Sequence, residues 1–231
     1  MIPHIIHQTW KNENVDEHLA VLAETWREKH PGWGYKLWTD GMNRTFIAEN
    51  YPDFLNTYDN YPHNIQRVDA VRYYILYHMG GVFIDMDFEC LQNISPLLNN
   101  NECVFGLEPD EHCTRFNKEK ILCNAFMACT PGNLFFETIC TELKIQGGMA
   151  DTAGASWMQI LETTGPFKLT RIFDGYQHKS SIKVLPADVI YPLSLSETRR
   201  LFNETLGVDK SLQKKVNDAY AVHYFLGSWL S

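Results

Sequence analysis

Residues 80–87, with the sequence GGVFIDMD, constrain the fold of this chain more than any other segment. The glycine pair is typical of a tight turn, and the apolar triplet that follows has the length and branching of a buried strand. Asp85 and Asp87 come directly after that strand. Because ligands of open α/β sheets bind beyond the carboxyl ends of the strands, we expect both aspartates at a ligand-binding edge.

Two carboxylates this close together indicate a cation site. Their mutual repulsion raises the pKa of each, and a bound cation removes that cost. Oxygen ligands suit Mg²⁺ or Mn²⁺, which bridge protein carboxylates and substrate phosphates. An Asp-x-Asp triplet by itself also occurs in solvated loops. The apolar strand before Asp85 favours a metal–diphosphate site instead.

The segment before the glycine pair predicts a helix over residues 64–79, because apolar residues recur there at helical spacing and Gly80 is a stop signal. Asp69 and Arg72 are three residues apart and therefore share one face of this helix. A surface ion pair of this kind contributes only about 0.2–0.5 kcal/mol. Since both charges stand in an otherwise apolar stretch, we expect a partly buried pair that faces a polar ligand.

Strands and helices alternate along the first half of the chain, which predicts an α/β fold. We expect strands at 2–7, 35–38, 82–84, 103–107, 123–129, 182–185 and 220–225. We expect helices at 16–30, 42–50, 53–60, 64–79, 133–144 and 152–163, and loop and helix over 195–218. Residues 108–120 show no periodicity, and a loop of this length is either a functional lid or partly mobile. The whole of 1–231 is interpreted as a single domain with a mostly parallel central sheet flanked by helices.

Charge and hydropathy exclude two classes of partner. The net charge of −8, without a long Lys/Arg run, argues against a nucleic-acid-binding surface. The chain shows neither a transmembrane segment nor an apolar export leader, so we expect a cytoplasmic location. Six cysteines without zinc spacing are then expected to stay reduced.

Several segments together resemble the Asp-x-Asp glycosyltransferases of family 32. They are residues 2–10 (IPHIIHQTW), 68–77 (VDAVRYYILY), 80–87, 124–128 (NAFMA) and 164–166 (TGP), followed by His223, Ser228 and Trp229. This family includes the yeast initiating α-1,6-mannosyltransferase and bacterial capsule and lipopolysaccharide transferases, and it is similar to the glucosylating domain of large clostridial toxins.

The resemblance implies a GT-A fold and an enzyme of polysaccharide or glycan synthesis. It implies a UDP- or GDP-linked sugar as donor, a divalent cation, usually Mn²⁺ and otherwise Mg²⁺, and a hydroxyl of a glycan or other molecule as acceptor. The transferred group is a hexose or N-acetylhexosamine, and its anomeric configuration is retained.

Carried over position by position, the resemblance also implies roles for individual residues. Asp69, Arg72, Asp85 and Asp87 match the catalytic group, in which Asp69 and Arg72 bind the donor sugar, Asp85 contacts ribose and sugar, and Asp87 binds the metal. Donor binding further involves Trp10, which stacks on the base, Asn124, which lies near the transferred sugar, and Ser228 and Trp229. His223 matches the C-terminal segment that completes the metal and diphosphate site. Gly165 and Pro166, most simply a turn, border the acceptor cleft in the family.

Two other functions remain open at this level. Asp85, Asp87 and His223 would also serve a metal-dependent phosphoesterase or nucleotide-sugar hydrolase, although such enzymes usually use two metals and more ligands. A non-catalytic nucleotide-sugar-binding protein is the other alternative. For a transferase, no carboxylate stands out as a covalent nucleophile. We therefore expect front-face displacement, in which a diphosphate oxygen takes the acceptor proton.

Overall fold

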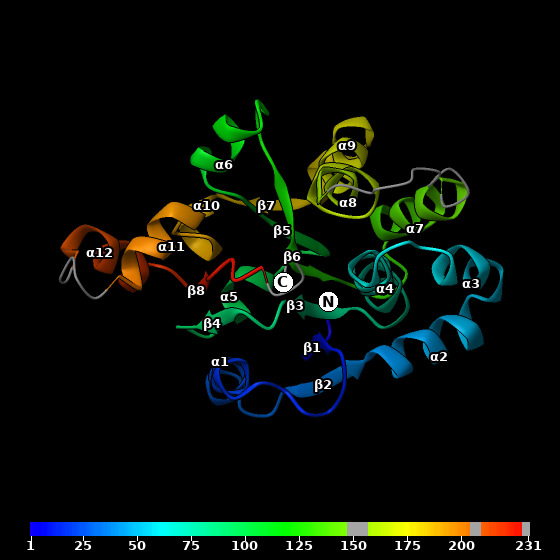
Figure 1. Cartoon of the computed structure of the whole chain (residues 1–231), viewed down its shortest axis with the longest axis horizontal. Helices are drawn as coiled ribbons and strands as arrows, with labels where there is room; N and C mark the ends of the chain where they lie inside the picture. The colour runs from blue at the N-terminus through cyan, green and yellow to red at the C-terminus, as the bar shows by residue number, and fades with distance from the viewer. Residues whose placement is uncertain (147–156, 204–208, 228–231) are drawn as a thin grey trace.

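The computed structural model describes residues 1–146, 157–203 and 209–227 (Figure 1). Within these ranges a six-stranded central sheet has the spatial order β2 (Gly34–Thr39), β1 (Ile5–Trp10), β3 (Gly81–Ile84), β6 (Leu122–Cys129), β5 (Cys103–Leu107), β7 (Lys183–Leu185). Strand β6 is antiparallel to β3 and β5, and the other pairings are parallel. The expected mostly parallel sheet is confirmed.

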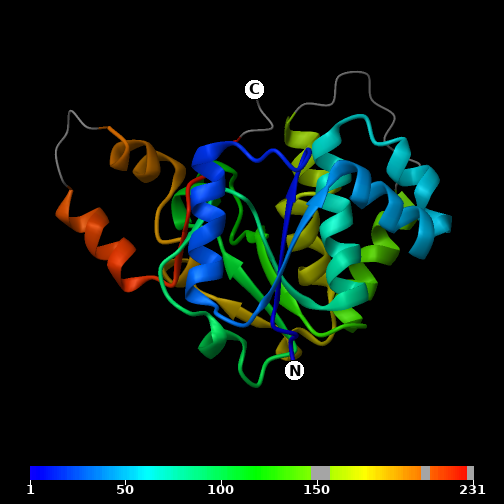
Figure 2. The same cartoon turned by 90° about the horizontal axis from the view of Figure 1, so that it is seen from below.

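Helices cover both faces of this sheet because successive side chains of a strand point to opposite faces. Phe83 packs into one core, and its neighbours Val82 and Ile84 pack into the other. The first core lies under α2 (Asp40–Asn50), α3 (Pro52–Asp59), α4 (Asn64–Met79), α7 (Leu134–Gln146) and α9 (Pro166–Gly175). Helix α8 (Trp157–Thr163) packs against α4 and α9. Figure 2 shows the strands between this group and the elements of the opposite face.

The opposite face carries α1 (Glu17–Lys29), α5 (Ser95–Leu98), α10 (Ala187–Ile190) and a separate two-stranded sheet of β4 (Phe88–Cys90) and β8 (Ala221–His223). The remaining described elements are α6 (Asp110–Arg115), the 3₁₀ turn η1 (Lys179–Ser181), α11 (Leu195–Leu201) and α12 (Lys210–Asp218). Two helical layers around one sheet confirm the α/β class.

The glycine pair joins α4 to β3 without a spacer. Gly80 and Gly81 have φ values of 64° and 100°, a region that other residues rarely adopt. A Cβ at Gly81 would lie 2.7 Å from the carbonyl oxygen of Ile5. This close approach lets β3 pair with β1, and it ties the helix that carries Asp69 and Arg72 directly to the strand that ends at Asp85.

Three expectations about individual elements were wrong. Strand β1 begins at Ile5 rather than residue 2, because Pro3 accepts a turn hydrogen bond from the Ile5 N–H. Residues 108–120 contain α6, whose six residues are too short to show a helical period. The closing strand expected at 220–225 is shorter: β8 spans Ala221–His223, and it pairs with β4.

Other predictions were incomplete. Helix α9 was not predicted, although Pro166 stands at its first turn, where proline is favoured. Of the helix expected at 152–163, the described part is α8, which begins at Trp157. Ser228 and Trp229, with their expected donor contacts, lie outside the described residues.

Candidate active site

The predicted site residues of three neighbouring strands lie at one edge of the sheet. Trp10 is the last residue of β1, and Asp85 follows β3, which is parallel to β1. Asn124 stands near the start of β6, whose direction is opposite. The carboxyl ends of β1 and β3 and the amino end of β6 therefore meet, as expected from the sequence.

Asp85, Asp87 and His223 form the centre of this edge. One possible ligand atom from each lies within 4.8 Å of the other two. The Nε2 atom of His223 is 3.0 Å from Oδ1 of Asp87, and the Leu226 N–H donates to Oδ2 of Asp87 at 2.9 Å. His223 reaches this position because it is the partner of Phe88 in the β4–β8 pair, and its ring stacks on Phe88 at 4.5 Å.

The chemistry of these three side chains fits a divalent cation. Carboxylate oxygens with one imidazole nitrogen suit Mn²⁺, and oxygens alone suit Mg²⁺. Neighbouring ligands of an octahedral ion at about 2.1 Å lie about 3 Å from each other, and the Asp87–His223 distance of 3.0 Å matches this spacing. A cation would also separate two carboxylates that otherwise repel each other.

The three groups have opposed electrostatic environments. Burial disfavours ionisation of Asp87, but the charge and hydrogen bond of His223 outweigh burial and lower the pKa of Asp87. Burial alone would lower the pKa of His223, but the charge and hydrogen bond of the Asp87 carboxylate outweigh burial, so the pKa of His223 is raised. Burial raises the pKa of Asp85. The Arg72 charge opposes this shift, and the Asp87 charge adds to it. Asp87 is therefore the more acidic carboxylate of the two.

Arg72 links α4 to the Asp-x-Asp segment. Its guanidinium lies 3.2 Å from a carboxylate oxygen of Asp69 and 3.2 Å from one of Asp85, and it donates to the Asn124 carbonyl at 2.9 Å. Arg72 is only 2% exposed and Asp69 5%. The expectation of a partly buried pair is confirmed, and burial is nearly complete. Direct contact of this pair with a donor sugar stays a prediction.

Asp69 has further partners that hold it in place. Its two carboxylate oxygens accept from the Asn124 side-chain amide at 2.9 Å and from the Thr164 hydroxyl at 3.1 Å. Burial raises the pKa of Asp69, while Arg72, Thr164 and Asn124 oppose that shift. Thr164, which directly precedes the Gly165-Pro166 turn, is thus a direct partner of a predicted catalytic residue.

Sequence reasoning missed the role of Gln8. Its side chain is buried in β1, donates to the Asp85 carbonyl at 3.2 Å and accepts from the Tyr35 hydroxyl at 2.8 Å. Both ends of the amide are therefore occupied, and the backbone at Asp85 is held from the β1 side. A polar residue at a buried strand position was the available signal, because such groups are retained only with hydrogen-bond partners.

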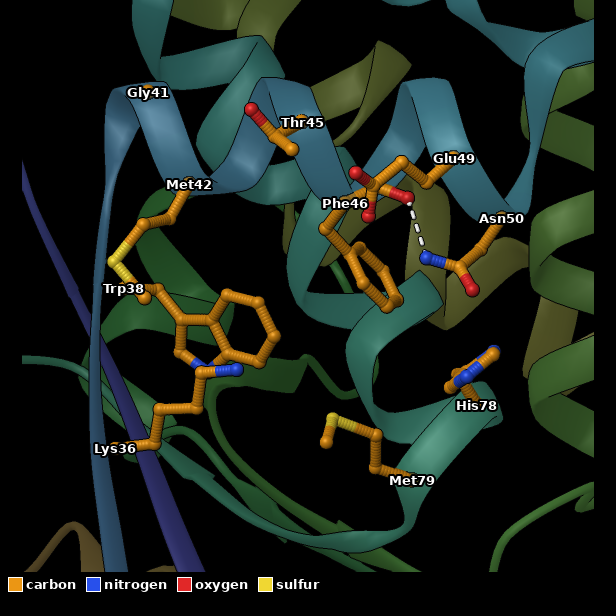
Figure 3. A pocket seen from close by; sticks show the side chains of 10 residues that line it. All are labelled: Lys36, Trp38, Gly41, Met42, Thr45, Phe46, Glu49, Asn50, His78 and Met79. Atoms are coloured by element: carbon orange, nitrogen blue, oxygen red, sulfur yellow. Dashed lines mark hydrogen bonds between the residues drawn. The ribbon is translucent and has the colours of Figure 1, made fainter.

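A cavity of about 460 Å³ lies elsewhere, between β2, α2 and the end of α4 (Figure 3). The Lys36 amine lies across the Trp38 ring there, 3.5 Å from its centre. None of the predicted site residues lines this cavity. Only the end of α4, which leads straight into the start of β3, lies at the sheet edge opposite Asp85.

Two further expectations concern the chain as a whole. All six cysteines are buried with free thiols. Among the described helices, none combines the length and the apolar character that crossing a bilayer requires.

Comparison with known proteins identifies the family of this chain. The family described as a glycosyltransferase sugar-binding region containing a DXD motif matches residues 16–104, which include Asp85 and Asp87. Inositol phosphoceramide mannosyltransferase 2 of Schizosaccharomyces pombe is 36% identical over 179 residues, 78% of this chain and 48% of that protein. Mannosyl phosphorylinositol ceramide synthase CSH1 of Saccharomyces cerevisiae is 33% identical over 181 residues, which are 78% of this chain and 45% of that protein.

The chain thus spans about half the length of these curated relatives. Among solved structures, the PaToxG glycosyltransferase has a TM-score of 0.55 at 14% identity, covering 95% of this chain and 89% of that chain. The ligand-free glycosyltransferase domain of the YGT toxin has a TM-score of 0.52 at 10% identity, covering 79% and 80%. These likenesses concern the fold, which is GT-A. The chain belongs to glycosyltransferase family 32, whose sugar-binding region contains the DXD motif.

Proposed function

We propose that this chain transfers a hexose, and mannose in particular, from a nucleotide-diphosphate sugar to a hydroxyl acceptor, with a divalent cation and with retention of anomeric configuration. The observation that carries the proposal is the convergence of Asp85, Asp87 and His223 within 4.8 Å at the carboxyl edge of the sheet. Mannose is favoured because one relative is named a mannosyltransferase and the other a mannosyl phosphorylinositol ceramide synthase.

Asp87 and His223 would hold the cation, with Asp85 beside them. The cation, Mn²⁺ or Mg²⁺, supplies positive charge that stabilises the leaving diphosphate. Trp10 is half-buried at the end of β1, where its ring can stack on the nucleobase. The base would then lie at β1 and the diphosphate at the carboxyl end of β3.

Arg72 and Asp69 would orient the donor sugar through a rigid network. Arg72 forms ion pairs with Asp69 and with Asp85. Asn124 is hydrogen-bonded to both Arg72 and Asp69. Groups held in this way need no reorganisation when substrate binds. The network thus fixes Asn124 and the Asp-x-Asp segment on the two sides of the space proposed for the sugar.

Front-face displacement remains the proposed route. A double displacement needs a carboxylate free to attack the anomeric carbon, whereas Asp69 and Asp85 are both paired to Arg72. In the proposed route the acceptor hydroxyl attacks from the side of the leaving group, a diphosphate oxygen takes its proton, and the nucleoside diphosphate leaves.

The acceptor is proposed to be an inositol phosphate headgroup, because the names of the relatives refer to inositol phosphoceramide. A lipid-linked inositol offers several hydroxyls and meets the requirement for a hydroxyl acceptor. The absence of a nucleic-acid partner, the cytoplasmic location and the single-domain organisation stay predictions.

The test is a donor and metal panel on the purified chain. GDP-mannose, UDP-glucose, UDP-galactose and UDP-N-acetylglucosamine are each incubated with Mn²⁺, Mg²⁺ or EDTA. Sugar release and transfer to detergent-dispersed inositol phosphoceramide are measured, and the anomeric configuration of the product is read by NMR. We expect the fastest turnover with GDP-mannose and Mn²⁺, none with EDTA, and an α-linked product.

Three outcomes would contradict the proposal in different ways. Release of sugar phosphate instead of free sugar would indicate a phosphoesterase. Metal-dependent donor binding without any turnover would indicate a binding protein. An inverted product would exclude the retaining mechanism while leaving the transferase assignment intact.

A further inference from the structure

Glu108 lies at the same sheet edge as Asp85, although it is remote from the Asp-x-Asp segment in sequence. Strands β3 and β5 are both antiparallel to β6 and therefore parallel to each other. Asp85 directly follows β3, and Glu108 directly follows β5. Along this edge the order is Trp10 on β1, Asp85 after β3, Asn124 on β6 and Glu108 after β5. Figure 1 shows β5 and α6 on the side of β3 opposite to β1.

The Glu108 carboxylate is held by His112 of α6. Nδ1 of His112 lies 2.8 Å from Oε2 of Glu108, and the two side chains are 9% and 10% exposed. The Leu195 N–H donates to Nε2 of His112 at 2.9 Å. Because Nε2 accepts, Nδ1 carries the proton and donates it to Glu108. The imidazole is thus neutral, and within the described ranges Glu108 has an ion-pair contact with no Lys or Arg.

The Glu108 carboxylate lies close enough to the candidate site for its charge to act on neighbouring side chains. Burial raises the pKa of the Cys123 thiol on β6, and the Glu108 charge adds to this shift. Glu108 is also close enough to His223 for its charge to act on that side chain. A nearly buried carboxylate without a cationic partner is costly to retain for stability alone. Its position therefore points to a ligand.

We propose that Glu108 binds the acceptor, accepting a hydrogen bond from a hydroxyl of the incoming polyol or sugar. A carboxylate has about four lone-pair sites, of which His112 uses one and the Cys123 thiol another. Strand β6 lies between β3 and β5, so Glu108 stands beyond Asn124 along this edge, on the side away from Asp85. This inference rests on the proposed function, which places the base at β1, the diphosphate at β3 and the sugar near β6.

A structural role for Glu108 is the competing explanation, because His112 also connects α6 to α11. Glu111 provides a matched control. It stands on the same helix and accepts from the hydroxyls of Ser194 at 2.6 Å and Ser196 at 2.7 Å, so it ties the same two segments together. Loss of Glu111 tests the connection, whereas loss of Glu108 tests the connection and the proposed hydroxyl contact together.

The experiment compares Glu108→Gln and Glu111→Gln with the unsubstituted chain. With Mn²⁺ and the donor that is hydrolysed fastest, hydrolysis by water is measured alongside transfer to myo-inositol, glycerol and methyl α-mannoside. For Glu108→Gln we expect a rate of donor hydrolysis within about twofold of the unsubstituted chain. The transfer-to-hydrolysis ratio should be at least about tenfold lower, because one charge-assisted hydrogen bond to the acceptor is lost. For Glu111→Gln we expect an unchanged ratio.

The outcomes separate this inference from the function on which it rests. The acceptor role is overturned if Glu108→Gln and the unsubstituted chain have the same transfer-to-hydrolysis ratio. This includes the case in which neither protein transfers sugar to any of the three acceptors. A parallel loss of both reactions with a lowered melting temperature, which a structural role predicts, also overturns it. Should Glu108→Gln not fold, Glu108→Asp is judged by the same ratio. Absence of donor hydrolysis in the unsubstituted chain contradicts the proposed function itself, and the inference falls with it.

Discussion

Oδ1 of Asp87 and Nε2 of His223 lie 3.0 Å apart, although the two residues are separated by 136 positions in the sequence. The short β4–β8 pair creates this contact, because Phe88 and His223 are opposite each other in its register. One imidazole thereby comes beside the Asp-x-Asp carboxylates without contributing to the central sheet. The metal site that we propose depends on this pair of strands.

Asp87→Ala should lower metal-dependent donor turnover by about 100-fold or more, because a direct cation ligand is removed. Asp85→Ala should be nearly as damaging. Asp59→Asn is the control, since Asp59 forms an exposed surface ion pair with Arg44. Turnover in Mn²⁺ is the measurement. Activity of Asp87→Ala close to that of the control would mean that the metal site has been placed wrongly.

His223→Phe should weaken Mn²⁺ binding at least about tenfold, the minimum seen even for residues that only support a ligand. Phenylalanine keeps a ring that can stack on Phe88 and removes both nitrogens. Titration of the nucleotide-free protein with Mn²⁺, followed by electron paramagnetic resonance, gives the affinity. An unchanged affinity together with lowered turnover would show that His223 positions Asp87 and does not bind the metal.

Arg72→Lys should lower kcat by about 10- to 100-fold, because displacements near 1 Å in a reacting centre have effects of this size. The guanidinium contacts Asp69, Asp85 and the Asn124 carbonyl at once, and an ammonium cannot reproduce that fork. Arg44→Lys is the matched control, since its paired contacts with Asp59 are exposed and weakened by solvent. A loss of less than a few-fold would assign Arg72 a purely structural role.

Gln8→Met should weaken metal-dependent donor binding about tenfold, in the range found for residues that orient ligands. The substitution keeps the volume and removes the amide that donates to the Asp85 carbonyl. Gln92→Met removes a similar bond, to the Ala219 carbonyl, and serves as control. Isothermal titration with nucleotide and Mn²⁺ measures the change. Equal affinities for the two variants would show that Gln8 does not position Asp85.

Acid should destabilise the protein through His7. The Trp38 indole N–H donates to Nδ1 of His7, so Nε2 carries the proton and donates to the Gly80 carbonyl. Burial lowers the pKa of His7 to about 4. The unfolded chain, with a pKa of about 6.5, therefore takes up a proton first, and stability falls as the pH drops from 6.5 toward 4, by about 3 kcal/mol over the full range.

Urea unfolding between pH 7.5 and 4.5 measures this dependence. His7→Gln should lose that part of the pH dependence, whereas His18→Gln, at an exposed position of α1, should keep it. Identical pH profiles for His7→Gln and the unsubstituted protein would show that another group is responsible.

Local patterns in the sequence predicted those parts of the fold that depend on neighbouring residues. Helix α4 was predicted with the bounds it has, because its apolar residues recur over sixteen positions and a glycine pair ends it. Helix α6 was missed because six residues do not complete two turns. Strand β8 was predicted, but its partner was not, since a strand of three residues carries no information about which edge it joins.

By itself, the sequence determined the helix with Asp69 and Arg72, the turn that needs glycine, and the apolar strand that places two aspartates at its carboxyl end. These follow from periodicity and backbone sterics, which act over a few residues. Only the tertiary structure decided that His223 reaches Asp87, that Gln8 holds the Asp85 carbonyl, and that Glu108 shares their edge. Each of these contacts depends on strand order and register, which are set by how the whole chain buries its apolar surface.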